Sequence, residues 1–224
     1  MVYRRTEKVV RRLAQRHAAI VAAARAAASE GGMAAVQIAP VAERAGIAAG
    51  TVYRYFPSKT ELIGALVTAV SEREIGAVRR AADAAPGPLS AIAAAIATFA
   101  ARALAHRRLA WAVIAEPVDA EVDAMRLGYR RALAAELESR IKAAVAAGKL
   151  PEIDSAVAAP ALVGALLEGL IGPLAPSGTG DIGRSRASVQ AITLIALRGI
   201  GVVDAHARGL VVQTVLPASD GDAA

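Results

Sequence analysis

The sequence predicts an all-α protein of about nine helices, and two observations support this. Apolar residues recur at every third or fourth position over most of the 224 residues, which is the period of a helix with one buried face. Glycine and proline clusters separate these periodic stretches, as at Gly31-Gly32 and Pro86-Gly87-Pro88. No stretch of the sequence requires a β-strand.

The first predicted helix runs from about residue 9 to the glycine pair at 31 and 32. Its apolar stripe consists of positions 10, 13, 17, 20, 21, 24, 27 and 28, with His17 expected to pack on it. Basic residues precede or begin this helix: Arg4, Arg5, Lys8, Arg11 and Arg12. They fit either an arm that touches the phosphates or minor groove of DNA or a free solvated tail.

Two short helices joined by a glycine turn are predicted next, between Gln37 and Phe56. Val41, Ala42 and Ala45 form one apolar face, and Gly46 ends the first of the two helices. The second begins near Ala49 and stops at Pro57, because the residue before a proline is pushed out of the α region. This is the layout of a helix-turn-helix, whose second helix enters the major groove of DNA. The alternative is an αα-corner with exposed tyrosines.

The second short helix carries side chains suited to DNA. Val52 and Phe56 lie at i and i+4, so we expect them to share a face and anchor the helix to its own domain. The residues left for phosphates and base edges are Thr51, Tyr53, Arg54 and Tyr55. Ser58 and Glu61 have the spacing of a capping box at the start of the following helix. Lys59 lies in its first turn, where the helix dipole favours a phosphate.

The excess positive charge lies in the same region. Residues 1–60 contain ten Lys/Arg and three Glu, whereas the remaining residues contain sixteen basic and seventeen acidic side chains. A basic segment that coincides with a helix-turn-helix indicates a polyanionic partner, double-stranded DNA.

Six further helices follow by periodicity, and each ends at a glycine, a proline or a capping residue. They are expected at 58–82, 89–105, around 111–114, 120–147, from 155 to about 171, and 184–199, followed by a flexible tail from 204. The last two helices are apolar on nearly all sides, and one core cannot easily cover both. We therefore expect a homodimer with a four-helix interface, to which the sequence assigns Leu162, Leu166, Leu170, Ile192 and Ile195.

The helices between 58 and 147 are expected to form a second core with a pocket for a small apolar or amphipathic effector. The candidate lining residues are Phe99, Trp111, Glu116, Met125, Arg126 and Tyr129. The competing interpretation is ordinary packing, because a methionine and aromatics at helical spacing are more often core residues.

Composition excludes other classes. The chain has no cysteine and three scattered histidines, so we expect no metal site and no cofactor. No Ser/His/acid constellation indicates an enzyme. Residues 178–183 match GxGxxG, but no strand precedes them, so a loop is expected there. The apolar run from Ser155 to Pro176 contains Glu168 and two internal prolines, so a membrane span is not expected. The N-terminus is basic but has no uninterrupted apolar region, so a secretory signal is not expected either.

The segment AERAGIAAGTVYRYFPSKTELI, residues 42–63, resembles the signature of the TetR family of bacterial transcriptional repressors. Ala45-Gly46-Ile47, Gly50-Thr51-Val52-Tyr53 and Ser58-Lys59 fall on it in register. Two positions depart from the signature, since Ala48 replaces a capping serine or threonine and Gln37 precedes Pro40. A missing cap costs about 1 kcal/mol.

The resemblance implies a DNA-binding domain over residues 1–60 and an effector-binding and dimerisation domain over 61–203, with a tail over 204–224. It adds Gln37, Ala48, Ala49 and Gly50 to the DNA-binding residues. It implies a cytoplasmic, ligand-responsive repressor that binds a palindromic operator as a homodimer. A constitutive or architectural DNA-binding dimer without an effector remains the alternative.

Overall fold

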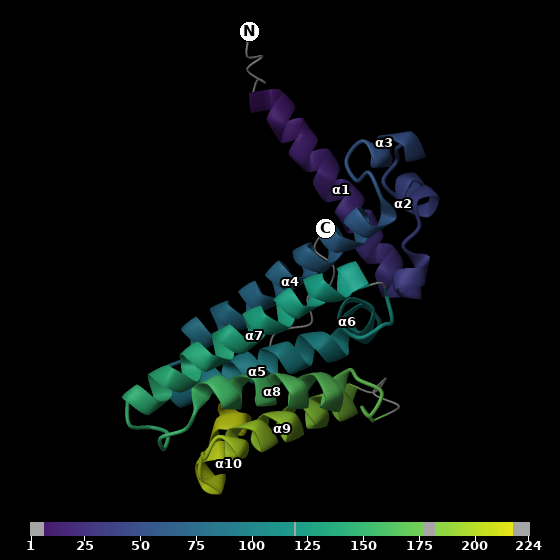
Figure 1. The fold of residues 1–224 in the computed structure, drawn as a ribbon. Helices are drawn as coiled ribbons and strands as arrows, with labels where there is room; N and C mark the ends of the chain where they lie inside the picture. The colour runs from purple at the N-terminus through teal and green to yellow at the C-terminus, as the bar shows by residue number, and fades with distance from the viewer. Residues whose placement is uncertain (1–6, 119, 177–181, 217–224) are drawn as a thin grey trace.

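The computed structural model describes residues 7–118, 120–176 and 182–216. Every regular element in these ranges is helical, as predicted (Figure 1). The elements are α1 (Glu7–Gly31), η1 (Met33–Ala35), α2 (Ile38–Arg44), α3 (Ala49–Tyr53), α4 (Lys59–Asp83), α5 (Pro88–Ala105), α6 (Arg107–Ile114), α7 (Ala120–Ala146), α8 (Ser155–Leu170), α9 (Ile182–Gly199) and α10 (Asp204–Gln213).

A small helical head occupies one end of the molecule. The C-terminal half of α1, η1, α2, α3 and the first turns of α4 surround one apolar cluster there (Figure 1). Ile20, Val41, Val52 and Leu62 are fully buried in it. The N-terminal half of α1 is different: its first buried residue is Ile20, and the preceding turns extend past α2 and α3.

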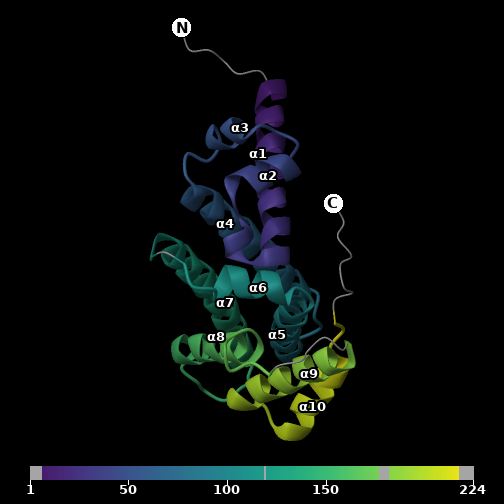
Figure 2. The ribbon, with the colours of Figure 1, turned by 90° about the vertical axis from the view of Figure 1, so that its right-hand side faces the viewer.

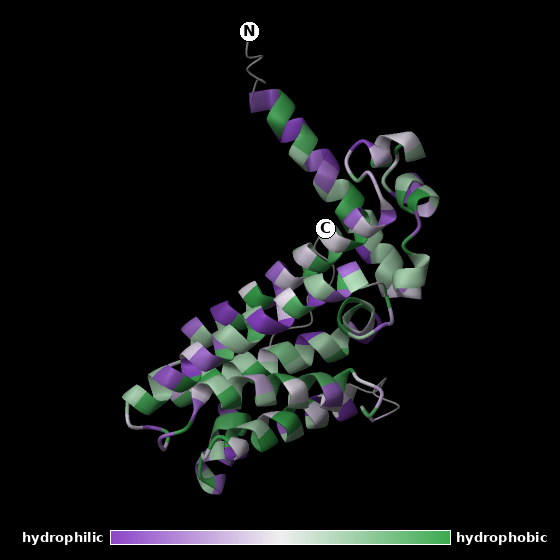
Figure 3. Ribbon diagram, in the orientation of Figure 1, coloured by the Kyte–Doolittle hydropathy of each residue, from purple (hydrophilic) through white to green (hydrophobic). Residues whose placement is uncertain are grey.

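The remaining helices form a larger body around α5. This helix packs on α4, α7 and α9. Most of its residues are alanine, leucine or isoleucine (Figure 3), and no face of the helix is exposed. Among the described helices it alone has the length and apolar composition to cross a membrane, yet two thirds of it is buried inside the protein. It therefore has the environment of a core helix. Helices α8, α9 and α10 lie at the end of the body away from the head (Figure 2).

Helix α4 connects the two parts. Its N-terminus is capped by Ser58, whose side-chain oxygen accepts a hydrogen bond from the Glu61 backbone N–H at 3.1 Å. Leu62 and Leu66 are buried on the side of the head, and Val70 and Val78 are buried farther along the helix, as the apolar spacing predicts.

The C-terminal region differs from the prediction. A flexible tail was expected from residue 204, but residues 204–213 form α10, which is the reason why ten α-helices are described instead of about nine. Ala207 and Leu210, three positions apart on one face of α10, are buried against α9 and α5. These two apolar residues are enough to hold the short helix on the body. Residues 217–224 lie outside the described part of the chain, as do 178–181 of the GxGxxG match.

Candidate nucleic-acid interface and effector cavity

The turn between α2 and α3 is built on Gly46. This residue has a φ of 65°, and the N–H of Ile47 donates to the Ala42 carbonyl at 3.0 Å. A left-handed glycine with this hydrogen bond closes a helix in the Schellman manner and sends the chain sharply away. The side chains of Val52 and Phe56 are then buried beneath α3, as predicted, and His17 of α1 contacts the Phe56 ring at 4.8 Å between centroids.

The opposite side of α3 faces solvent. Tyr53 is 51% exposed, Arg54 is exposed, and Thr51 and Tyr55 are half-buried. Ala48, Ala49 and Gly50 are exposed at the start of the helix, where Ala48 is an N-cap without a side-chain hydrogen bond. The first N–H groups of α3 are therefore open to an acceptor from outside.

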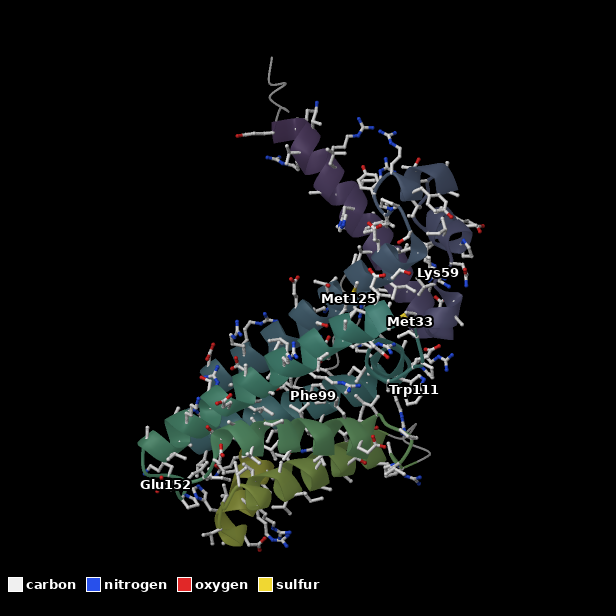
Figure 4. All side chains as sticks on the ribbon, in the orientation of Figure 1. Met33, Lys59, Phe99, Trp111, Met125 and Glu152 are labelled. Carbon is white, nitrogen blue, oxygen red and sulfur yellow. The ribbon has the colours of Figure 1, made fainter. Side chains whose placement is uncertain are left out.

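The two remaining predicted DNA-binding residues flank this surface. Gln37 is exposed at the N-cap of α2, and its amide donates to the Ala34 carbonyl at 2.9 Å. Lys59 is half-buried at the first position of α4 (Figure 4). All nine predicted positions therefore lie in the head, on or beside the helix-turn-helix.

An exposed ion pair braces the head. Arg44 at the end of α2 forms two hydrogen bonds of 2.6 Å with the carboxylate of Glu30 in α1. The Arg44 guanidinium lowers the pKa of the Glu30 carboxyl. This pair fixes α2 against α1 and thereby sets the position of the helix that follows.

A cavity of about 30 Å³ lies inside the body, between α4, α5, α6 and α7. Its walls are mainly apolar, with Val70, Phe99 and Val113 among them. A cavity of this size accommodates water but no drug-sized molecule, for which pockets of about 300–1,000 Å³ are usual.

One side of the cavity is polar. Arg102 of α5 donates to both carboxylate oxygens of Glu74 of α4, at 2.6 and 2.9 Å. Tyr129 of α7 is 5% exposed, and it lines the cavity together with Glu74 and Arg102. Burial first, and then the nearby Glu74 carboxylate, raises the pKa of the Tyr129 phenol. The hydroxyl is therefore a neutral donor and acceptor at the wall of the cavity.

Of the six residues predicted to bind an effector, two line this cavity: Phe99 and Tyr129. Trp111 is half-buried on α6 but is not part of the wall. Met125 packs on the backbone of Gly64 in α4, where a Cβ atom would come within 2.5 Å of the methionine sulfur. Trp111 and Met125 lie where the helices of the body meet the head (Figure 4).

Glu116 and Arg126 also lie at this junction, away from the cavity. Glu116 follows α6, and its carboxylate accepts a hydrogen bond of 3.0 Å from the backbone N–H of Met33 in the head. Arg126 is 3% exposed and donates to the backbone carbonyls of Ala112 and Glu116. Burial lowers the pKa of the Arg126 guanidinium, although Asp123 lies 3.2 Å from it. Arg126 thus holds the end of α6, and Glu116 connects that end to the head.

A groove of about 350 Å³ runs between α8 and α9. Of the predicted dimer residues, Leu162, Leu166, Ile192 and Ile195 line it, and Leu170 does not. The three leucines are buried within the protomer, Ile192 is half-buried and Ile195 is 59% exposed. Val157 on the rim is 65% exposed, with the small side chains of Ala161 and Ala165 beside it.

Comparison with known proteins agrees with this geometry. The sequence profile described as "Bacterial regulatory proteins, tetR family" matches residues 20–66, which contain α2, α3 and the start of α4. The helix-turn-helix segment therefore has the sequence of a TetR-family DNA-binding domain. The chain is 49% identical over 59 residues to the HTH-type transcriptional repressor KstR of Rhodococcus jostii. That match covers 26% of this chain and 28% of KstR, so it spans about a quarter of the relative's length.

Solved structures extend the similarity in fold to the body. RolR in complex with resorcinol has a TM-score of 0.64 at 20% identity, covering 93% of this chain and 98% of RolR. FadR from Bacillus subtilis in complex with stearoyl-CoA has a TM-score of 0.69 at 18% identity, covering 81% of this chain and 98% of FadR. The TetR fold, with its N-terminal helix-turn-helix and C-terminal helical domain, therefore describes both parts of the molecule.

The sequence did not predict the polar side of the cavity. Arg102 is the single charged residue of α5, an otherwise apolar helix, and Glu74 lies 28 positions earlier in α4. A lone charge in a buried helix requires a partner, so Arg102 could have been recognised. Nothing in the sequence identifies Glu74 as that partner, because other acidic residues of α4 have similar surroundings.

Proposed function

We propose that this protein is a transcriptional repressor that binds a palindromic operator as a homodimer and is released by a small apolar or amphipathic effector. Under this proposal residues 1–60 form the DNA-binding domain, residues 61–203 bind effector and dimerise, and the protein acts in the cytoplasm. The observation that carries it is the connection of an exposed recognition helix, through α4, to an apolar cavity with one polar side formed by Glu74, Arg102 and Tyr129.

The head supports the DNA-binding part of the proposal. Tyr53, Arg54 and Lys59 offer hydroxyl, guanidinium and ammonium groups, and the open N-terminus of α3 adds backbone donors. The charge of this region complements a phosphate backbone. KstR, which is similar over the same region, is a repressor by its name.

The cavity supports effector binding, with the TetR-fold structures of RolR and FadR carrying resorcinol and stearoyl-CoA as parallels. Its apolar walls favour an apolar body, and the Glu74–Arg102–Tyr129 side favours one polar group on it. Because the cavity of about 30 Å³ is too small for such a molecule, binding requires the surrounding helices to separate. The described conformation is therefore the one that we assign to the DNA-binding state.

Two routes connect the cavity to the head. Val70 lines the cavity on α4, and Leu62 and Leu66 of the same helix are buried in the head. Ile114 lines the cavity on α6, and Glu116 follows it and bonds to the Met33 N–H. Separation of α4 from α6 changes both connections, and thereby the spacing of the two recognition helices of a dimer.

The dimer is proposed from the exposed apolar residues of α8 and α9. Val157 and Ile195 flank the groove, and self-complementary pairing about a two-fold axis covers both. Leu162, Leu166 and Leu170 are already buried in the protomer. Under this proposal they pack below the exposed residues and do not themselves contact the partner. A dimer holds two half-sites about 34–36 Å apart, as a palindromic operator requires.

Binding of substituted proteins to DNA tests the first part of the proposal. An operator is selected by the wild-type protein from a randomised pool of duplexes, and affinities are then measured for it and for its scrambled sequence. Tyr53→Phe and Lys59→Ala should weaken both duplexes equally by removing phosphate contacts. Thr51→Val and Arg54→Ala should reduce the preference for the selected duplex by about 1–3 kcal/mol each. Unchanged affinities in all four variants would reject this docking of the head.

A constitutive DNA-binding dimer is the second candidate function. The small size of the cavity favours it, because a filled or collapsed core needs no ligand. The two candidates differ in one property, the response of DNA affinity to a small molecule.

A further inference from the structure

The N-terminal half of α1 is exposed on most sides, although His17 contacts the Phe56 ring. Residues 7–19 contain no buried side chain, and at 1.5 Å per residue they extend about 20 Å from the head (Figures 1 and 2). An isolated helix of this length is marginal in water. A surface that covers this half of α1 would therefore stabilise it.

This extension is basic. It carries Lys8, Arg11, Arg12 and Arg16 against a single acid, Glu7. Within the described residues none of these four cations forms an ion pair, whereas Arg79, Arg102 and Arg140 of the body each pair with a glutamate. The partner that suits the extension is thus an anion that lies outside the described chain.

A groove of about 1180 Å³ separates the extension from the recognition helix. Arg12 and Arg16 lie on the α1 wall, and Thr51, Arg54 and Tyr55 lie on the facing wall. Arg12 and Arg16 are one turn apart, about 6 Å along the helix. Both side chains are long and line the same groove, so their guanidiniums can contact neighbouring phosphates of one DNA strand.

We propose that one sugar–phosphate strand of the operator lies in this groove, held by Arg12 and Arg16, while α3 reads the adjacent major groove. The proposal rests on the DNA-binding function proposed above and adds a contact outside the helix-turn-helix. The occupant is a polymer strand, since the groove is larger than usual small-molecule pockets and lies open beside the exposed face of α3. A strand in the groove also covers side chains of the N-terminal half of α1 that are exposed in the free protein.

Salt dependence of DNA affinity tests the proposal, with the duplex that the wild-type protein selects from a randomised pool as the probe. Each lost phosphate contact should reduce the slope of log affinity against log salt by about 0.9, so Arg12→Ala/Arg16→Ala should reduce it by about 1.8. Alanine preserves helix propensity, so circular dichroism should be unchanged. The scrambled duplex should lose affinity by the same factor, because phosphate contacts carry no sequence information.

Arg11→Ala is the matched control. Arg11 is exposed on the same helix, with the same charge, but it does not line the groove. Its slope should change by much less than that of Arg12→Ala. Equal slopes for Arg11→Ala and Arg12→Ala, or a double variant that keeps the wild-type slope, would overturn the proposal while DNA binding by the head stands. A wild-type protein without salt-dependent DNA affinity would overturn the proposed function together with this inference.

Discussion

The head and the body present their functional side chains in opposite ways. In the head, the predicted contact residues come from residues 37–59, lie on or beside the two short helices of the helix-turn-helix, and are exposed or half-buried. In the body, the polar residues of the cavity come from α4, α5 and α7 and from His106 at the end of α5, and they are buried or half-buried. A surface for a rigid polymer can be built from one local motif, whereas a cavity requires the packing of distant helices. The DNA-binding surface is therefore encoded in consecutive residues, whereas the cavity is not.

The largest expected effect concerns the apolar groove between α8 and α9. Unlike the cavity, this part of the body is exposed to solvent. Ile195→Arg should abolish dimerisation, because an unpaired charge in an apolar interface costs about 3–5 kcal/mol. The protomer should stay folded, since Ile195 is 59% exposed. Light scattering gives the mass, and gel shifts should show loss of operator binding. Val212→Arg on α10, also exposed, is the control. A dimeric Ile195→Arg protein with full operator affinity would show that this face is not the interface.

A smaller effect is expected at the junction of the two parts. Arg126→Met removes the donor to two carbonyls at the end of α6, and leaving buried carbonyls unpaired costs about 1–3 kcal/mol each. Urea unfolding should show a lower free energy of unfolding. Arg131→Met, at an exposed position of the same helix, should change it by less than about 0.5 kcal/mol. Equal stability of the two variants would mean that Arg126 does not hold the junction.

The difference between local motifs and long-range packing also decides which features could be predicted from the sequence. The apolar period predicted the helices, and Gly46, Pro57 and Ser58 fixed the boundaries of the helix-turn-helix through local backbone rules. The cavity depends on which helix faces touch, so Met125, Glu116 and Arg126, all plausible by residue type, lie at the head–body junction instead. The docking of α10 was missed for the same reason, because its short apolar face becomes significant only against α5 and α9.

The smallest effect should come from the cavity itself. Tyr129→Phe removes the hydroxyl from the cavity wall and keeps the ring, so the free energy of unfolding should change by less than about 1.5 kcal/mol. Affinity for an effector found by mass spectrometry of co-purified molecules should fall by about 0.5–1.5 kcal/mol, the value of one hydrogen bond. Calorimetry measures both quantities. Lower stability with unchanged effector affinity would assign Tyr129 a structural role only.

The claim that cavity and head are coupled is tested most directly by linkage. The affinity of the effector is measured with and without a saturating amount of the selected operator. If the effector favours a conformation that binds DNA weakly, operator DNA must weaken effector binding by the same factor as the effector weakens operator binding. We expect such a reciprocal loss, in the usual range of about 5- to 150-fold. Equal effector affinities in the two measurements would contradict the coupling and leave a constitutive DNA-binding dimer as the function.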